Sequence, residues 1–212
     1  MDGFPAEPPG RPPLWRPDFT LIEKPELDAL TGAEWRLIEA QRKAYMQGRQ
    51  AELVLGLFEA ARGDASFGYA LSMYAHGLQA ATMAMQSGAD EEFVVVALLH
   101  DIGFTMAGPS HGEFAAALLR PYISERNRWV LEMHQVFQTH HAHDHPHFDS
   151  HERERFDGHP FFADAADFVA RFDQNAIDPH YPTLPIEAFA PMVRRLFAKP
   201  PGRRFQGPVI TP

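Results

Sequence analysis

Six residues whose side chains can bind metal ions follow one another in order along the middle of this chain. They are His76, His100, Asp101, His111, His134 and Asp173. All but one fall within or at the end of a segment predicted to be an apolar helix. A buried carboxylate or imidazole without a partner costs free energy, and a metal ion supplies that partner. Nitrogen and oxygen ligands without sulfur suit iron, manganese or zinc.

The adjacent pair His100-Asp101 is the most informative part of this set. On a helix, neighbouring side chains diverge by about 100°. That geometry suits either one residue on each of two ions or an Asp101 carboxylate that bridges both. Taken singly, His111 and His134 are more simply explained as hydrogen-bonded core residues or residues at solvated helix ends. Taken together, the six residues favour a metal centre.

The elements that must position these residues are predicted to be helices. Apolar residues recur at spacings of three and four, and capping residues and glycines mark the ends. The predicted helical segments are 33–62 with a break at Gly48, 68–87, 91–101, 110–119, 124–137, 160–172 and 186–197. Ser110 and Glu113 have the spacing of a capping box, which would place His111 in a first helical turn. No strand is required.

The run FVVVALL within 91–101 has two interpretations. Its β-branched residues alone are compatible with a buried strand. Acidic residues at its start, Gly103 after its end and a helix on either side favour a short buried helix. The fold expected is therefore all-α, a single helical bundle.

Composition and charge limit the function classes. A chain of 212 residues supports one well-buried core. We expect a proline-rich arm at 1–30, a helical domain at 31–198 and a proline-rich tail at 199–212, with the arm a candidate oligomer contact. The net charge of −9 disfavours nucleic acid and membrane partners. The sequence has no cysteine, which excludes disulfides and cysteine-ligated metal. Its first residues are polar and proline-rich where a signal peptide would be apolar, so we expect a cytoplasmic protein.

The stretch ALLHDIG, residues 97–103, resembles the signature of the HD superfamily, in which an upstream His, a His-Asp pair and a distant Asp hold metal. More narrowly, YAHGLQAATMAMQSGADEEFVVVALLHDIG is similar to the small HD-domain mixed-valent diiron oxygenases, the group of myo-inositol oxygenase and the phosphonate-cleaving oxygenases. The likeness continues through SHGEFAAALLR, ISERNRWVLEMH and RFDQ. It implies an HD-domain bundle in which the six residues hold two irons, Fe2+ and Fe3+, with Asp101 as the bridge.

The chain departs from these relatives around the site. Phosphonate-cleaving members carry basic residues at the positions of Phe104 and Gln138 and after Asp173, where this chain has Gln174-Asn175-Ala176. Their Tyr and Glu ahead of the first His, which cover the iron, correspond to Ser66 and Tyr69. A dianionic head group needs charge-assisted donors, so these departures argue against a phosphonate substrate.

Five residues are predicted to contact the substrate. Tyr69, Phe104 and Gln138 would shape the pocket, and His140 and His141 would act as donors or support the metal ligands. The latter two begin a segment, 140–151, in which six residues are His. That segment is predicted to be a surface loop, and metal storage or pH sensing are the alternatives.

Three functions follow from this interpretation. The leading one is an oxygenase that cleaves a small hydroxylated molecule with dioxygen at two irons, with no separate catalytic side chain assigned. The second is an HD-type phosphohydrolase, for which manganese, zinc or magnesium would serve. The third is a metal-binding module without turnover. The expected partners are the small-molecule substrate and dioxygen, and homo-oligomerisation is left open.

Overall fold

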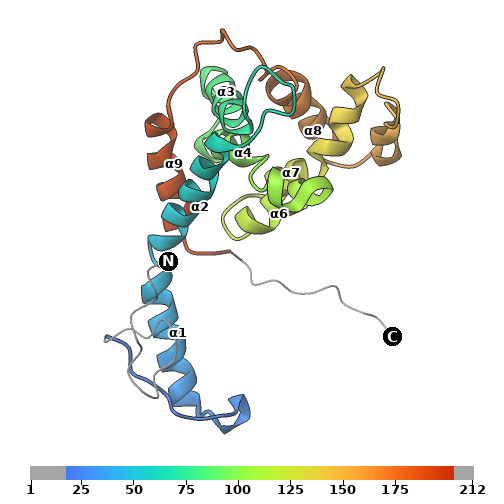
Figure 1. The fold of residues 1–212 in the computed structure, drawn as a ribbon. Coiled ribbons are helices and arrows are strands. Elements are labelled where there is room, and N and C mark those ends of the chain that lie inside the picture. Colours follow the sequence, from blue (N-terminus) through green and yellow to red (C-terminus); the bar gives the residue numbers. More distant parts are fainter. Residues whose placement is uncertain (1–17, 203–212) are drawn as a thin grey trace. The chain divides into compact units, whose positions relative to one another are not determined.

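Helices make up all the regular structure in the part of the chain that can be described. The computed structural model describes residues 18–202, and within these limits it contains no strand (Figure 1). The prediction of an all-α fold is confirmed. The predictions for the arm and the tail fall partly on residues 1–17 and 203–212, which lie outside the described residues.

The chain divides into two compact units, with the boundary between Gln47 and Gly48. The described part of the first unit contains a 3-10 helix, Leu27–Ala29, and α1, Gly32–Met46. A capping box starts α1: the Glu34 N–H donates to Thr31 Oγ1 at 3.3 Å, and the Thr31 N–H donates to the Glu34 carboxylate at 2.7 Å. No residue of α1 is buried. The predicted domain start at residue 31 therefore precedes α1, whereas the boundary between the units follows α1. Gly48, the first residue after this boundary, has a φ of 73°.

The second unit holds the remaining helices. They are α2 (Arg49–Ala60), α3 (Met73–Gln86), α4 (Glu91–Leu99), α5 (Phe104–Ala107), α6 (His111–Leu119), α7 (Glu125–Gln138), α8 (Phe162–Phe168) and α9 (Ile186–Ala198). Short 3-10 helices cover Ala61–Gly63, Gly108–Ser110, Thr139–His141 and Glu152–Phe156, and a π-helix covers Val169–Asp173.

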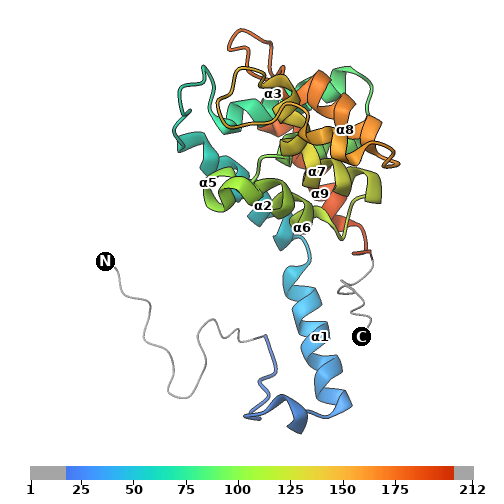
Figure 2. The same cartoon turned by 90° about the vertical axis from the view of Figure 1, so that its right-hand side faces the viewer.

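Helix α4 occupies the centre of this unit. Every residue from Val94 to Leu99 is buried, because α3, α7 and α9 all pack against this helix. A helix that is apolar all round belongs in such a position, which explains why the run FVVVALL lacks a one-sided pattern. Around it, α6 packs on α7, α8 packs on α7 and α2 packs on α9 (Figures 1 and 2). The interpretation of 91–101 as a short buried helix is confirmed.

Three local predictions are wrong. The helix that contains His76 starts at Met73 rather than at residue 68, because Phe67 and Gly68 both have positive φ, 56° and 102°. Ser110 makes no side-chain cap bond, since it ends a 3-10 helix with φ −105° and ψ 17° instead of the extended conformation of a cap residue. The helix predicted over 160–172 changes from α to π at Val169.

Among the described residues no single helix is long and apolar enough to cross a membrane. The segments Glu91–Leu99 and Phe104–Leu119 pass that test of length and composition only as a pair, which is bent by 50°.

Candidate metal centre

The six predicted ligands converge inside the second unit from five different parts of the bundle. His76 lies on α3, the pair His100-Asp101 follows α4, His111 is the first residue of α6, His134 lies on α7 and Asp173 ends the π-helix. The four histidines and Asp173 are buried, and the Asp101 side chain is 12% exposed. The fold therefore gathers all six predicted residues, from positions up to 97 residues apart in the sequence.

One oxygen of Asp101 faces the first half of this cluster. Asp101 Oδ2 lies 3.5 Å from the Nε2 atoms of both His76 and His100. Those two Nε2 atoms lie 3.0 Å apart, and Asp173 Oδ1 lies 3.4 Å from the first and 3.5 Å from the second. These atoms form what we call the first donor set: His76, His100, Asp173 and Oδ2 of Asp101.

The other oxygen of Asp101 faces the second half. Asp101 Oδ1 lies 2.9 Å from His111 Nε2 and 3.2 Å from His134 Nε2. These two Nε2 atoms are again 3.0 Å apart. The second donor set is therefore His111, His134 and Oδ1 of Asp101. One carboxylate thus contributes an oxygen to each of two donor sets.

Hydrogen bonds at the far side of each ring fix its orientation. The Nδ1 atoms of His100, His111 and His134 lie 2.7 to 2.9 Å from the carbonyl oxygen three residues earlier, those of Ala97, Gly108 and Leu131. His76 Nδ1 lies 3.0 Å from the carbonyl oxygen of Ala176. A carbonyl oxygen only accepts, so each Nδ1 carries a proton and donates. Each neutral ring then turns the lone pair of Nε2 toward the centre, the arrangement typical of metal-bound histidines.

This arrangement of lone pairs requires positive charge between the donors. Two Nε2 lone pairs at 3.0 Å repel each other unless a proton or a metal ion lies between them. Burial alone would lower the pKa of His100, but the carboxylates of Asp101 and Asp173 raise that pKa to about 9. Burial opposes ionisation of Asp101, yet the surrounding histidines hold its pKa well below the ordinary value. The site therefore favours bound cations.

Asp173 supplies an independent test of the fit to a metal. It is fully buried, and its Oδ2 has no hydrogen-bond partner among the described residues. Burial would raise its pKa, but contacts with His100 and His76 lower it instead. An ionised, buried carboxylate oxygen without a donor is costly unless a cation compensates it. The donor atoms of His76, His100 and Asp173 lie within 4.8 Å of one another, so these residues fit a metal ion.

A glycine follows one histidine of each donor set and lets two helices approach closely. A Cβ atom on Gly77 would lie 2.6 Å from the carbonyl oxygen of Leu98, on α4. A Cβ atom on Gly112 would lie 2.6 Å from the carbonyl oxygen of Leu131 and 3.1 Å from His134 Cε1, on α7. Such contacts are too short for any side chain larger than hydrogen. The repeated dipeptide His-Gly in the sequence was the signal that could have identified both.

The segment 176–184 is bound along α3, on the same face as His76. Besides the bond between His76 and the Ala176 carbonyl, the buried Gln79 amide donates to the Asp178 carbonyl oxygen at 2.8 Å and accepts from its N–H at 3.1 Å. Further along, the Leu184 N–H donates to Thr82 Oγ1 at 3.0 Å. These contacts join the chain after Asp173 to the helix that carries the first ligand, and sequence patterns did not reveal them.

The residues predicted to contact the substrate lie in different surroundings. The Phe104 ring packs on His111 with centroids 4.9 Å apart, and the exposed Gln138 donates to Asp173 Oδ1 at 3.3 Å. His140 Nδ1 contacts the Ser150 carbonyl oxygen at 3.2 Å, and His141 Nε2 is buried without a partner among the described residues. Tyr69 is 57% exposed, and within residues 18–202 its side chain makes no hydrogen bond or ring contact with the six ligands.

Sequence reasoning missed Phe67, which lies at the edge of this region. Its ring is 60% exposed and packs on Phe104 with centroids 5.8 Å apart. Its φ of 56° is rare for a bulky residue, and such strain is often retained near functional sites. Phe67 and Phe104 together give the second donor set an aromatic side.

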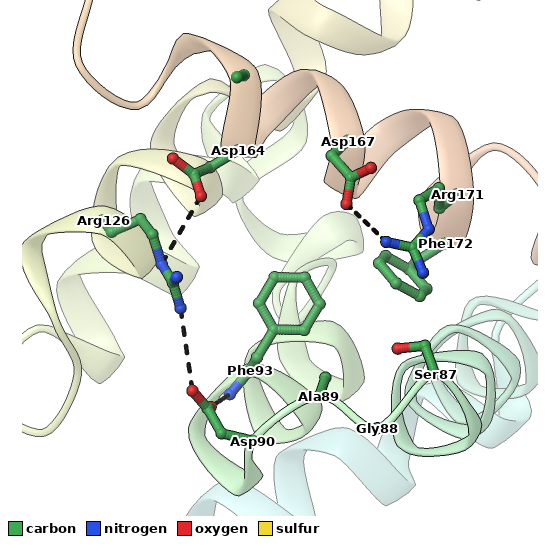
Figure 3. Close-up of a pocket in the computed structure, with 11 residues that line it drawn as sticks. Ser87, Gly88, Ala89, Asp90, Phe93, Arg126, Asp164, Asp167, Arg171 and Phe172 are labelled. Atoms are coloured by element: carbon green, nitrogen blue, oxygen red, sulfur yellow. Dashed lines mark hydrogen bonds and ion pairs between the residues drawn. The ribbon is translucent and has the colours of Figure 1, made fainter.

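A separate pocket of about 440 Å³ lies outside the donor sets (Figure 3). One of its lining residues is Phe172, which immediately precedes Asp173 in the sequence. Its charged side chains already have partners: Arg126 lies 4.0 Å from both Asp90 and Asp164, and Arg171 lies 3.0 Å from Asp167. None of the six predicted ligands lines it. The donor sets, and not this pocket, are therefore the candidate site.

Comparison with known proteins gives one partial similarity. No family model matches the chain. A stretch of 58 residues is 47% identical to the [1-hydroxy-2-(trimethylamino)ethyl]phosphonate dioxygenase (glycine-betaine-forming) of Leisingera caerulea. The stretch covers 27% of this chain and 29% of that dioxygenase. The chain is therefore similar to an oxygenase over a limited region.

Proposed function

We propose that this protein is a two-metal oxygenase that oxidises a small hydroxylated molecule with dioxygen. The observation that carries the proposal is the position of Asp101, whose two oxygens each face a different pair of histidine Nε2 atoms, at 2.9 to 3.5 Å. A carboxylate in this position is suited to join two metal ions. The similarity to a dioxygenase supports oxygen chemistry over other uses of two ions.

The two donor sets differ in how much of a metal's coordination they fill. The first offers four protein donors, from His76, His100, Asp173 and Asp101. The second offers three, from His111, His134 and Asp101. A metal ion with fewer protein ligands keeps positions open for substrate, so we assign substrate binding to the second donor set.

The chemistry that the protein needs is a four-electron oxidation of substrate, with dioxygen as the electron acceptor and no external reductant. Two iron ions, when bound, would supply redox chemistry for dioxygen and Lewis acidity toward a substrate hydroxyl. Iron in the mixed-valent Fe2+/Fe3+ state is the metal we propose. Manganese, zinc or magnesium would fit the same donors.

The chain's own residues prepare the site for this reaction. The Nδ1–H bonds hold the four imidazoles in one tautomer, so no ligand has to reorient when a metal binds. Phe104 covers one side of His111 and keeps water from that side of the second donor set. The amide of Gln138 holds the Asp173 carboxylate in place from the exposed side of the site. Asp101 is partly exposed, so small molecules can approach the second donor set from solvent.

Metal analysis combined with spectroscopy tests the proposal. Protein produced in iron-supplemented cells should contain two iron ions per chain and, after partial reduction, should give the electron paramagnetic resonance signal of a mixed-valent pair. Hydroxylated small molecules would then be screened for substrate-dependent oxygen uptake. A single ion per chain, or two redox-silent ions, would contradict the oxygenase and leave hydrolysis of a phosphate ester as the function to test.

A further inference from the structure

Two short turns after α7 carry basic side chains that the proposed function does not use, and the first turn directly follows Gln138, whose amide donates to Asp173 Oδ1 at 3.3 Å. They are the 3-10 helices Thr139–His141 and Glu152–Phe156, which pack on each other. The contact between His140 Nδ1 and the Ser150 carbonyl oxygen, 3.2 Å, ties the segment between them together. His141 ends the first turn, and Arg153 is the second residue of the other turn.

His141 has a buried nitrogen with nothing bound to it. Its Nε2 is inaccessible to solvent and has no hydrogen-bond partner among residues 18–202. Burial lowers the pKa of His141, and the nearby charges of His140, Arg153 and His143 lower it further, while the Asp173 carboxylate opposes them. The charges of both Arg153 and Asp173 therefore act on the His141 imidazole.

Arg153 also lacks a partner. It is partly buried, yet it forms no ion pair or hydrogen bond with any residue in the described part of the chain. The other arginines in the described part of the second unit have partners: Arg155 lies 3.8 Å from Glu152, for example, and Arg171 lies 3.0 Å from Asp167. A guanidinium that gives up water without an anion is unfavourable, so this position is suited to an anion from outside the chain.

We propose that His141 and Arg153 bind an anionic group of the substrate, a carboxylate or a phosphonate, beside the metal centre. The proposal rests on the proposed function, since it treats the donor sets as the reacting centre. A guanidinium can donate two parallel hydrogen bonds to such a group, and the His141 Nε2 can donate a third once it is protonated. In a protein of net charge −9, an anionic substrate needs local cations of this kind.

The inference changes one expectation from the sequence. A phosphonate is disfavoured only by the positions where the phosphonate-cleaving proteins carry basic residues, and at Phe104 and Gln138 this chain has none. The structure packs the turn that carries Arg153 against the turn of His141, which follows Gln138 beside Asp173. A hydroxylated substrate that also carries an anionic group is therefore compatible with this site.

Binding of simple anions to the metal-loaded, full-length protein tests the inference. Methylphosphonate and acetate would be titrated separately by calorimetry, so that the two kinds of anionic group are compared directly. The Arg153→Gln and His141→Gln variants should each bind the preferred anion roughly tenfold or more weakly, as expected for the loss of a charge-assisted hydrogen bond. Arg155→Gln is the matched control, because Arg155 is exposed and already paired, and it should bind as the unaltered protein does.

Equal affinity in Arg153→Gln and Arg155→Gln would overturn the inference. Arg153→Lys keeps the charge but not the planar fork, so it should bind the anion more weakly than the unaltered protein, and this comparison tests the inference even if Arg153→Gln folds poorly. The proposed function fails separately. If the protein holds two redox-silent ions but its anion binding depends on Arg153, the oxygenase proposal is contradicted and the anion site is supported. If it holds a mixed-valent iron pair but its anion binding does not depend on Arg153, the oxygenase proposal is supported and the anion site is contradicted.

Discussion

Asp101 is the single residue on which both donor sets depend. Its two oxygens lie on opposite sides of the centre, at 3.5 Å from the nitrogens of one histidine pair and at 2.9 and 3.2 Å from those of the other. His100 also lies near the second set, since its donor atom is within 4.8 Å of those of Asp101 and His134. Asp101 is also partly exposed, and the histidines around it hold its pKa well below the ordinary value.

We expect Asp101→Ala to lose both metal ions, because each set is left with neutral nitrogens and at most one carboxylate. Elemental analysis of the purified variant, compared with the unaltered protein, measures this loss directly. His147→Ala is the control, since His147 is exposed and lies outside both donor sets. Retention of two ions per chain in Asp101→Ala would show that Asp101 does not bridge them.

Much of this centre could be predicted from residue types and their order. All six residues come together, although whether they hold metal stays a prediction. Three histidines bond the carbonyl three residues earlier, a local pattern that follows from helix geometry once their helices are known. The partner of His76 could not be predicted, because Ala176 lies 100 residues away. Arg153 could not be predicted either, since nothing in its local sequence distinguishes it from Arg155.

Among the secondary-structure elements, the close packing of helix pairs sets the distances between the ligand atoms. The α6 and α7 backbones approach closely at Gly112, and this closeness allows His111 and His134 to share one oxygen of Asp101. The sequence indicated these helices from spacing and caps. It did not indicate the π-helix at Val169–Asp173, because one inserted residue hardly changes a hydrophobic pattern but rotates the side chains that follow.

Gly112→Ala should separate α6 from α7. Its Cβ atom would lie 2.6 Å from a backbone carbonyl oxygen, so the free energy of unfolding should fall by about 1–3 kcal/mol, and metal binding at the second donor set should weaken. Gly56→Ala is a matched control in an exposed helical position with nothing within 4 Å, and it should stabilise the protein by about 0.5–1 kcal/mol. Denaturant unfolding of both variants gives the comparison, and equal effects would contradict this account.

The amide of Gln79 fixes the segment 176–184 to α3. Gln79→Ala removes two hydrogen bonds at a buried position, so we expect a loss of about 2 kcal/mol in unfolding free energy. Metal affinity at the first donor set should also fall, because the Ala176 carbonyl that orients His76 belongs to this segment. Gln86→Ala, which loses one exposed hydrogen bond to Tyr181, should change both quantities much less. An unchanged metal affinity in Gln79→Ala would show that the segment does not orient His76.

For the molecule as a whole, metal binding and protonation compete for the same nitrogen atoms. The pKa of His100 in the folded, metal-free protein is about 9, above its ordinary value of 6.5. The stability that its proton contributes is therefore fully present below pH 6.5 and is lost as the pH rises through 9. A metal ion bound at His100 would replace that proton and restore the missing positive charge.

The rise in Tm caused by added metal should consequently grow between pH 6.5 and pH 9. Thermal unfolding with chelator and with excess manganese, under anaerobic conditions across that range, measures the difference at each pH. The His100→Ala variant provides the comparison, and its smaller metal effect should change less with pH. A metal-induced rise in Tm that shrinks as the pH increases would contradict competition at this site.

The attachment of the segment 176–184 to α3 also bears on the order in which the donor sets form during synthesis. Asp173 and the Ala176 carbonyl are synthesised after the other five ligands, so a growing chain first exposes four histidines and Asp101 without the carboxylate that completes the first donor set. Only when the later residues reach α3 is His76 held in its final tautomer. We therefore expect the metal pair to be acquired as the last event of maturation, after the ribosome has delivered the helices that surround it.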